Sequence, residues 1–235
     1  MDAVTEIEAD LRSRAKAGRA EKEKAYLKSA LAHLGVPVPE IRKVARAHGE
    51  ERSLEQARAL ADALWARPVH ELRATAVELL DRRALTLEDL PRLEGWLREA
   101  KTWALVDPIA IALVGGVVER HGAGDALDRW AEDDDFWIRR AAMLALLRPL
   151  RRGDGDFERF GRYADAMLEE KEFFIRKAIG WVLRETGKKR PERVEAWLEP
   201  RAHRASGVTM REAVKPLGED AREALMRRYR DARAS

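Results

Sequence analysis

Cysteine is absent from this chain of 235 residues. Without it the protein can form no disulfide bond, no thiolate nucleophile and no cysteine-based metal site. The 5 histidines include no His-x-x-x-His pair, the spacing that places two imidazoles on one helix face. We therefore expect no bound metal and no cofactor.

Long apolar runs are also missing. The longest uncharged apolar run, Ile109 to Val118, is too short to span a bilayer. The first residues, MDAVTEIEADLRSR, are acidic and amphipathic and contain no apolar core of a secretory signal. These features predict a soluble cytoplasmic protein that is not attached to a membrane.

Alternation of β-branched residues, the pattern typical of strands, is not sustained anywhere in the chain. Helical periodicity with recognisable caps is present instead, and the links between the expected helices are short, which favours antiparallel neighbours. The sequence predicts an all-α fold in a single domain, 1–235. The expected helices cover residues 3–17, 20–34, 39 onward, 53–66, 69–81, 86–100, 102–121, 125–132, 135–149, 156–170, 172–187, 191–204, 208–217 and 218–232.

A repeat of 33 to 37 residues runs through the second half of the chain. DFWIRRAAMLALL, which begins at Asp135, aligns with EFFIRKAIGWVLR at a shift of 37 residues, and a weaker copy at a shift of 33 places Trp103 on Phe136 and Asp107 on Arg140. Helix pairs with this period predict a HEAT-like α-solenoid, a superhelix of antiparallel helix pairs with a concave surface.

Charge is balanced overall but not along the chain. The net charge is +3, while Asp, Glu, Lys and Arg sum to −5 over residues 1–135 and to +8 over residues 136–235. A basic second half indicates a cleft that binds a polyanion, most simply nucleic acid. The alternative is a set of arginine-rich helices that only face solvent.

Asp107 is the first candidate for chemistry. It lies among apolar neighbours, and Trp103 is four residues earlier, so both fall on one helix face. The repeat puts Asp107, Arg140 and Lys177 at the same position of three units, and Trp181 follows Lys177 by one turn. In the alternative interpretation, Asp107 caps a helix that begins at Pro108, and Trp103 is a core residue.

Other catalytic arrangements find little support. No Ser or His lies at helical spacing from Asp107, which argues against a Ser-His-Asp triad, and the glycine-rich segments lack the Gly-Lys-Ser/Thr ending of a phosphate loop. A carboxylate between aromatic rings suits the stabilisation of a developing positive charge.

Five segments carry a resemblance to a known family. They are AYLKSALAHLGVPVPEIR (Ala25 to Arg42), TWALVD, FWIRRAA, EFFIRKAIGWVLRE (Glu172 to Glu185) and TMREAVK (Thr209 to Lys215). In content and order they resemble the DNA alkylation repair family, AlkD-type bacterial DNA glycosylases built from HEAT-like repeats. The chain departs from the family pattern at Thr102, Ala104 and Pro216, and this leaves its lesion range open.

The resemblance implies roles for five residues. Trp103, Asp107 and Trp181 fall on catalytic cleft positions, Arg140 on a cleft arginine, and Tyr26 on a helix residue near DNA. The further DNA-binding candidates are basic residues of the second half, namely Arg139, Arg176, Lys177, Lys188, Lys189, Arg190, Arg211 and Lys215.

The implied activity is that of a monofunctional DNA glycosylase, a hydrolase that removes cationic alkylated purines such as 3-methyladenine and 7-methylguanine from double-stranded DNA. We expect a monomer that is associated with the nucleoid when bound to DNA. Two alternatives remain: a non-catalytic HEAT-repeat protein that binds bent or branched DNA, and an α-solenoid that binds protein.

Overall fold

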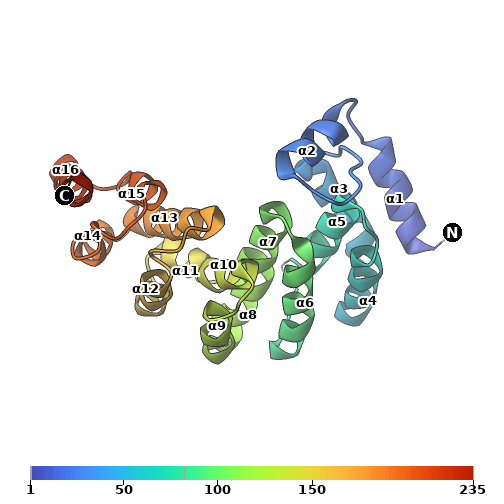
Figure 1. Ribbon diagram of the computed structural model, residues 1–235. Coiled ribbons are helices and arrows are strands. Elements are labelled where there is room, and N and C mark those ends of the chain that lie inside the picture. Colours follow the sequence, from blue (N-terminus) through green and yellow to red (C-terminus); the bar gives the residue numbers. More distant parts are fainter. Residues whose placement is uncertain (1, 82, 235) are drawn as a thin grey trace. The chain divides into compact units, whose positions relative to one another are not determined.

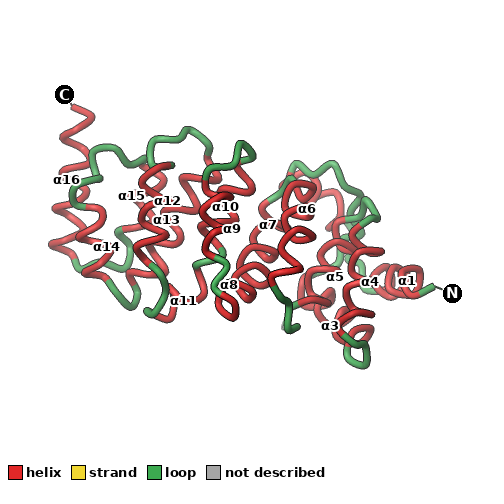
Figure 2. Tube along the Cα trace, turned by 90° about the horizontal axis from the view of Figure 1, so that it is seen from below, coloured by secondary structure: helices red, strands yellow, loops and turns green. Residues whose placement is uncertain are grey.

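The structure is a computed structural model that describes residues 2–81 and 83–234. Every regular element in these ranges is a helix (Figure 1), which confirms the predicted all-α class. The described ranges contain one isolated β-bridge, between Ala32 and Val69, and otherwise helices joined by loops (Figure 2). Among the described helices, none has the length and apolar character that a membrane crossing requires.

The chain divides into two compact units, residues 1–117 and 118–235. The boundary falls within helix α8 (Gly115–His121). The single domain expected from the sequence therefore stays a prediction, and each unit is described by itself.

The first unit packs α5 against both α3 and α4, while α6 packs against α7 and the π-helix η2 that follows it. Its buried side chains include Ile7, Leu64, Leu72 and Leu97, all 0% exposed. The elements of this unit before α8 are α1 (Ala3–Ser13), α2 (Arg19–Leu27), α3 (Val38–Gly49), α4 (Leu54–Trp65), α5 (His70–Leu80), the 3-10 helix η1 (Leu87–Asp89), α6 (Leu90–Ala100), α7 (Trp103–Pro108) and η2 (Ile109–Val114).

In the second unit the long helix α13 packs against α10, α11, α14 and α15, so that successive helix pairs lie side by side (Figure 1). Helix pairs that lie side by side are consistent with the HEAT-like α-solenoid that the repeat predicts, and the repeat type itself stays a prediction. The elements after α8 are α9 (Gly124–Ala131), α10 (Phe136–Leu144), α11 (Leu147–Arg152), α12 (Phe157–Ala166), α13 (Phe173–Gly187), α14 (Pro191–Leu198), α15 (Gly207–Ala213) and α16 (Glu219–Ala234).

The helix starts confirm the register of the repeat. Thr102, Asp135 and Glu172 cap α7, α10 and α13, and each side chain accepts the backbone N–H two residues later. Asp107 and Arg140 are therefore each the fifth residue of their helix, as Lys177 is in α13.

A second recurrence was not predicted. The seventh residue of α6, α9, α12 and α14 is aromatic in every case, namely Trp96, Trp130, Tyr163 and Trp197. All four are 9% exposed or less, so a large buried ring recurs at an interval of 33 or 34 residues along the chain. The spacing of these aromatic residues therefore reveals the same repeat period as the spacing of the helix caps.

Proline and a left-handed residue explain the two largest departures from the expected helices. The stretch expected as 102–121 is divided because Pro108 has no N–H to donate, and the π-helix η2 follows it at once. The stretch expected as 20–34 ends at Leu27, where Lys28 adopts a φ of 50°. Residues beyond Lys28 pair instead with the start of α5: the Ala32 N–H donates to the Pro68 carbonyl and the His70 N–H donates to the Ala32 carbonyl.

Candidate functional site

Helix α7 holds the predicted acid and its first aromatic neighbour. Trp103 is its first residue and is half-buried, whereas Asp107 lies one turn later and is 9% exposed. Thr102 is the N-cap, so the alternative in which Asp107 caps a helix starting at Pro108 is wrong. Asp107 instead stands just before the transition from α-helix to π-helix, a local irregularity that is frequent at functional sites.

Tyr26 lies against Trp103. The centroids of the two rings are 6.2 Å apart and the ring planes meet at 87°, an edge-to-face contact. Tyr26 is nevertheless 74% exposed, so most of its ring is available to a ligand. The structure therefore joins two residues that the resemblance had named separately.

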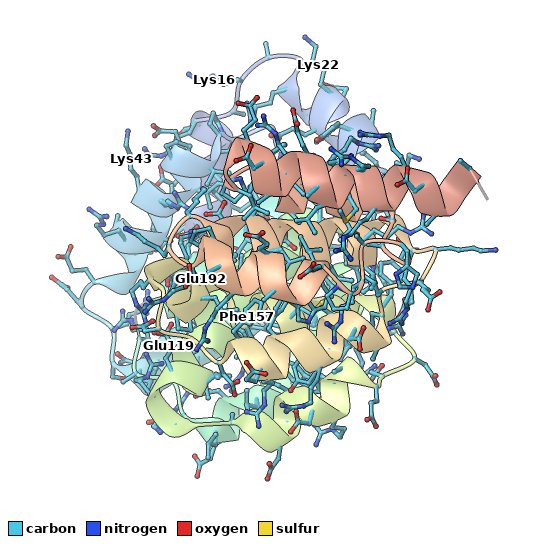
Figure 3. The ribbon with its side chains drawn as sticks, turned by 90° about the vertical axis from the view of Figure 1, so that its left-hand side faces the viewer. Lys16, Lys22, Lys43, Glu119, Phe157 and Glu192 are labelled. Carbon is cyan, nitrogen blue, oxygen red and sulfur yellow. The ribbon has the colours of Figure 1, made fainter. Side chains whose placement is uncertain are left out.

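Helix α2, which carries Tyr26, also presents cations that sequence reasoning missed. Lys22, Lys24 and Lys28 are exposed, and Lys22 points into solvent (Figure 3). The net charge of the first half does not show these lysines, because Glu21 and Glu23 are adjacent to Lys22 and offset their charge. The lysines at positions 22, 24 and 28 around Tyr26 were the feature of the sequence that could have indicated these cations.

In the second unit, Arg140 is an interior residue. It is 3% exposed, its Nη1 donates to the carbonyl oxygen of Phe174 at 2.5 Å, and its guanidinium carbon lies 5.9 Å from the centre of the Phe174 ring. Trp137 is buried against Phe136 and Phe174, which makes it a core residue. Trp181 is half-buried on α13, one turn after Lys177.

Two of the predicted DNA-binding cations are engaged in local structure. Arg139 forms two hydrogen bonds to the carboxylate of Glu170, at 3.1 Å and 2.8 Å, and also donates to the carbonyl oxygen of Asp133. Arg176 donates to the Glu170 carbonyl oxygen at 2.6 Å. These guanidinium groups fix the loop before α13, and only a part of each remains for a phosphate.

Four others have a partner at the surface, and the remaining two have none among the described residues. Lys177 and Lys215 contact Glu212, Lys188 contacts Glu185, and the Arg190 Nε donates to the Gly153 carbonyl oxygen. Lys189 and Arg211 are exposed, and no hydrogen bond or ion pair reaches either side chain within the described residues. Lys189 and Arg211 could therefore bind a phosphate without breaking an existing contact.

Glu212 is a charge centre between α13 and α15. Lys215 lies 2.9 Å from its carboxylate and Lys177 lies 3.0 Å away, and Arg184 also bonds to it. The hydrogen bond from Lys215, followed by that from Lys177 and the neighbouring charges, lowers the pKa of Glu212 to about 2. The carboxylate therefore stays ionised at neutral pH and links the two helices.

A separate cluster of ionisable residues includes one residue of α2. Glu23, His33 and Glu71 offer ligand atoms that are all within 4.8 Å of one another. The His33 ring stacks on His70, with centroids 4.6 Å apart and planes at 7°. Burial, and then the neighbouring His33, lower the pKa of His70 to about 4, so this imidazole is neutral at pH 7.

Comparison with known proteins identifies the family. The family described as DNA alkylation repair enzyme matches residues 7–217, which is most of the chain. The chain belongs to the DNA alkylation repair enzyme family. A search of curated proteins found no match.

Two solved structures share the fold. A predicted DNA alkylation repair enzyme from Enterococcus faecalis superposes with a TM-score of 0.76 at 23% identity, over 88% of this chain and 98% of that chain. AlkD2 from Streptococcus mutans superposes with a TM-score of 0.61 at 21% identity, over 83% of this chain and 98% of that chain.

Membership of the DNA alkylation repair enzyme family confirms the resemblance drawn from the five sequence segments. It places the protein in the repair of alkylated DNA and implies that it binds DNA. The roles of individual side chains stay predictions.

Proposed function

We propose that this protein is a monofunctional DNA glycosylase that hydrolyses the N-glycosidic bond of cationic alkylated purines such as 3-methyladenine and 7-methylguanine. The observation that carries the proposal is the arrangement on α7: Asp107 and Trp103 lie one turn apart on one face, and the exposed Tyr26 meets the Trp103 ring edge-on. A carboxylate beside aromatic rings suits a substrate that becomes positively charged at its sugar.

The main contribution that this reaction requires from the protein is electrostatic. Alkylation gives the purine a positive charge, so the base departs as a neutral molecule with the electron pair of the broken C–N bond. Positive charge then develops on the deoxyribose, water adds to its anomeric carbon, and the proton of that water passes to solvent. These reaction steps require no cofactor.

Asp107 would act on the charge that develops on the sugar. At an effective dielectric constant of about 20, a carboxylate about 4 Å from a unit positive charge contributes up to about 4 kcal/mol. That energy corresponds to about three orders of magnitude in rate. Burial to 9% exposure supports the use of a reduced dielectric constant.

The aromatic residues would hold the lesion nucleotide. Trp103 and Tyr26 present ring faces and edges on which a sugar and its neighbouring base can pack while water is excluded. By the resemblance, Trp181 would pack against the DNA backbone. Exposed Lys22 and Lys24 on α2, and Lys28 at its C-terminal cap, are further candidates for phosphate contacts, because each lies within four residues of Tyr26.

The test is base release from methylated duplex DNA by the wild type and by Asp107→Asn. We expect the variant to lose about 2–4 kcal/mol of transition-state stabilisation, roughly 30-fold to 1000-fold in kcat/KM, because the amide is neutral. DNA binding, measured by fluorescence anisotropy, should change little.

Asp134→Asn is the matched control, because Asp134 lies outside α7, in the loop before α10. It should retain full activity. Equal activity of the wild type and Asp107→Asn would remove the role assigned to Asp107. DNA binding without base release by the wild type would indicate the non-catalytic DNA-binding alternative, and the absence of DNA binding would indicate a protein-binding solenoid.

A further inference from the structure

The cluster of Glu23, His33 and Glu71 joins three segments of the first unit. Glu23 comes from α2, His33 from the loop after it, and Glu71 from the first turn of α5. Their ligand atoms lie within 4.8 Å of one another, close enough for one ion to contact all three. Glu23 and His33 are 10 positions apart and His33 and Glu71 are 38 positions apart, so no local motif in the sequence indicates this cluster.

His33 is the unusual member. Both of its ring nitrogens are shielded from solvent, and neither has a hydrogen-bond partner within the described part of the chain. Burying an unsatisfied polar atom is unfavourable by about 1–3 kcal/mol. The parallel contact with His70 fixes the plane of the ring, so one nitrogen is held in place within reach of both carboxylates. A bound cation would satisfy that nitrogen.

Glu71 is held in the same way as many metal-binding carboxylates. It is 0% exposed, and it accepts the backbone N–H groups of Leu34 at 2.9 Å, Gly35 at 2.6 Å and Val36 at 3.2 Å. An ionised carboxylate has about four acceptor positions, so three hydrogen bonds leave one. Bonds of this kind fix the direction of the remaining lone pair, the usual task of groups behind a ligand.

Glu23 completes the set. One of its carboxylate oxygens accepts a hydrogen bond from Arg19, and no other bond to this side chain occurs within the described residues. One of its carboxylate oxygens lies within 4.8 Å of the ligand atoms of His33 and Glu71. One imidazole and two carboxylates are donors that zinc and related divalent transition metals accept.

We propose that Glu23, His33 and Glu71 bind a divalent transition-metal ion of the zinc type, with water in the remaining position. The site is structural in effect and does not include Asp107. It ties α2 to α5.

Helix α2 benefits most from such a tie, because none of its residues is buried. One of its contacts with the rest of the unit is the ring contact of Tyr26 with Trp103. Tyr26 follows Glu23 by three residues, so an ion that holds Glu23 also limits the movement of Tyr26 relative to Trp103. The ion would therefore make the surface that carries Tyr26 more rigid.

The experiment uses the full chain stripped of metal by a chelator. Co²⁺ is added while its visible absorption is recorded, and Zn²⁺ is then added as a competitor. We expect saturation at one ion per chain, displacement of Co²⁺ by Zn²⁺, and slower amide exchange in α2 when Zn²⁺ is present.

Two variants assign the ligands. His33→Gln and Glu23→Gln should each weaken Zn²⁺ affinity by at least about tenfold. Glu23 lies on an unburied helix, so its variant keeps the fold even if substitution of His33 disturbs it. His48→Gln is the matched control, because His48 lies 3.6 Å from Asp10 and outside the cluster. No saturable binding by the wild type, or unchanged affinity in Glu23→Gln, would overturn the proposal.

Discussion

Gly35 shows how one residue can fix the position of a functional helix. Its φ is +81°, its N–H donates to Glu71, and its carbonyl oxygen accepts the N–H of Lys16 at 3.0 Å. A Cβ atom at this position would lie 2.8 Å from the backbone nitrogen of Ala20. Both the backbone conformation and the close approach require glycine.

Substitution at Gly35 tests this requirement. Gly35→Ala should lower the free energy of unfolding by roughly 1–3 kcal/mol, because it adds left-handed strain and a backbone clash. Gly95 lies within α6, and a Cβ atom added there would meet no other atom within 4 Å. Gly95→Ala should therefore raise the free energy of unfolding by about 0.5–1 kcal/mol.

Urea denaturation in the presence of a chelator compares the two glycine variants with the wild type. The two changes should have opposite signs. Destabilisation of similar size in both variants would show that the position of the glycine does not matter.

At the scale of elements, α13 and α15 are joined by side chains as well as by packing. The hydroxyl of Thr209 donates to the Arg176 carbonyl oxygen at 3.2 Å, and Gly180 is a point of close approach, where a Cβ would lie 3.1 Å from the Thr209 carbonyl oxygen. Glu212 adds the ion pairs with Lys177, Lys215 and Arg184. This contact should respond to acid.

The pKa of Glu212 is about 2 in the folded protein, whereas an unperturbed glutamate has a pKa of 4.5. The stabilisation is therefore complete above about pH 4.5 and is lost as the pH falls toward 2, where the folded protein also takes up the proton. Partial exposure of the lysines limits the contribution to roughly 1–2 kcal/mol.

Glu212→Gln should consequently be less stable than the wild type at pH 7, and the difference should nearly vanish only at about pH 2 or below. Denaturant titrations at a series of pH values measure the difference. A gap between the two proteins that does not depend on pH would show that packing, and not charge, is responsible.

At the scale of the whole molecule, a basic residue that lies in the basic half of the sequence is not necessarily available to bind DNA. The second half carries the excess of positive charge, yet Arg139 and Arg140 are directed to Glu170 and Phe174. Lys189 and Arg211 are exposed without partners in the described part of the chain. DNA binding should therefore depend unequally on residues that look alike in the sequence.

The salt dependence of DNA binding measures this inequality. Each phosphate neutralised by a cation contributes about −0.9 to the slope of log K against log salt concentration. Arg211→Ala should make the slope shallower by about that amount, whereas Arg139→Ala should leave it nearly unchanged and lower the melting temperature. Equal slopes in the wild type and Arg211→Ala would exclude Arg211 as a phosphate contact.

Much of the fold could be predicted because its determinants are local. Ser53 with Gln56 forms a capping box at the start of α4, where the sequence predicts a helix from residue 53. Thr102, Asp135 and Glu172 begin three helices in the register that the repeat gave. Cap chemistry and helical periodicity depend on residues within a few positions of each other. The family followed from the same local segments.

The sequence by itself thus determined the helices, their register and the i, i+4 pairing of Trp103 with Asp107, since each depends on neighbours within a turn. Only the tertiary structure decided that Tyr26 meets Trp103, that Arg140 turns inward to Phe174, and that Glu23, His33 and Glu71 form one cluster. Those contacts join residues tens of positions apart, and packing of whole helices brings such residues together.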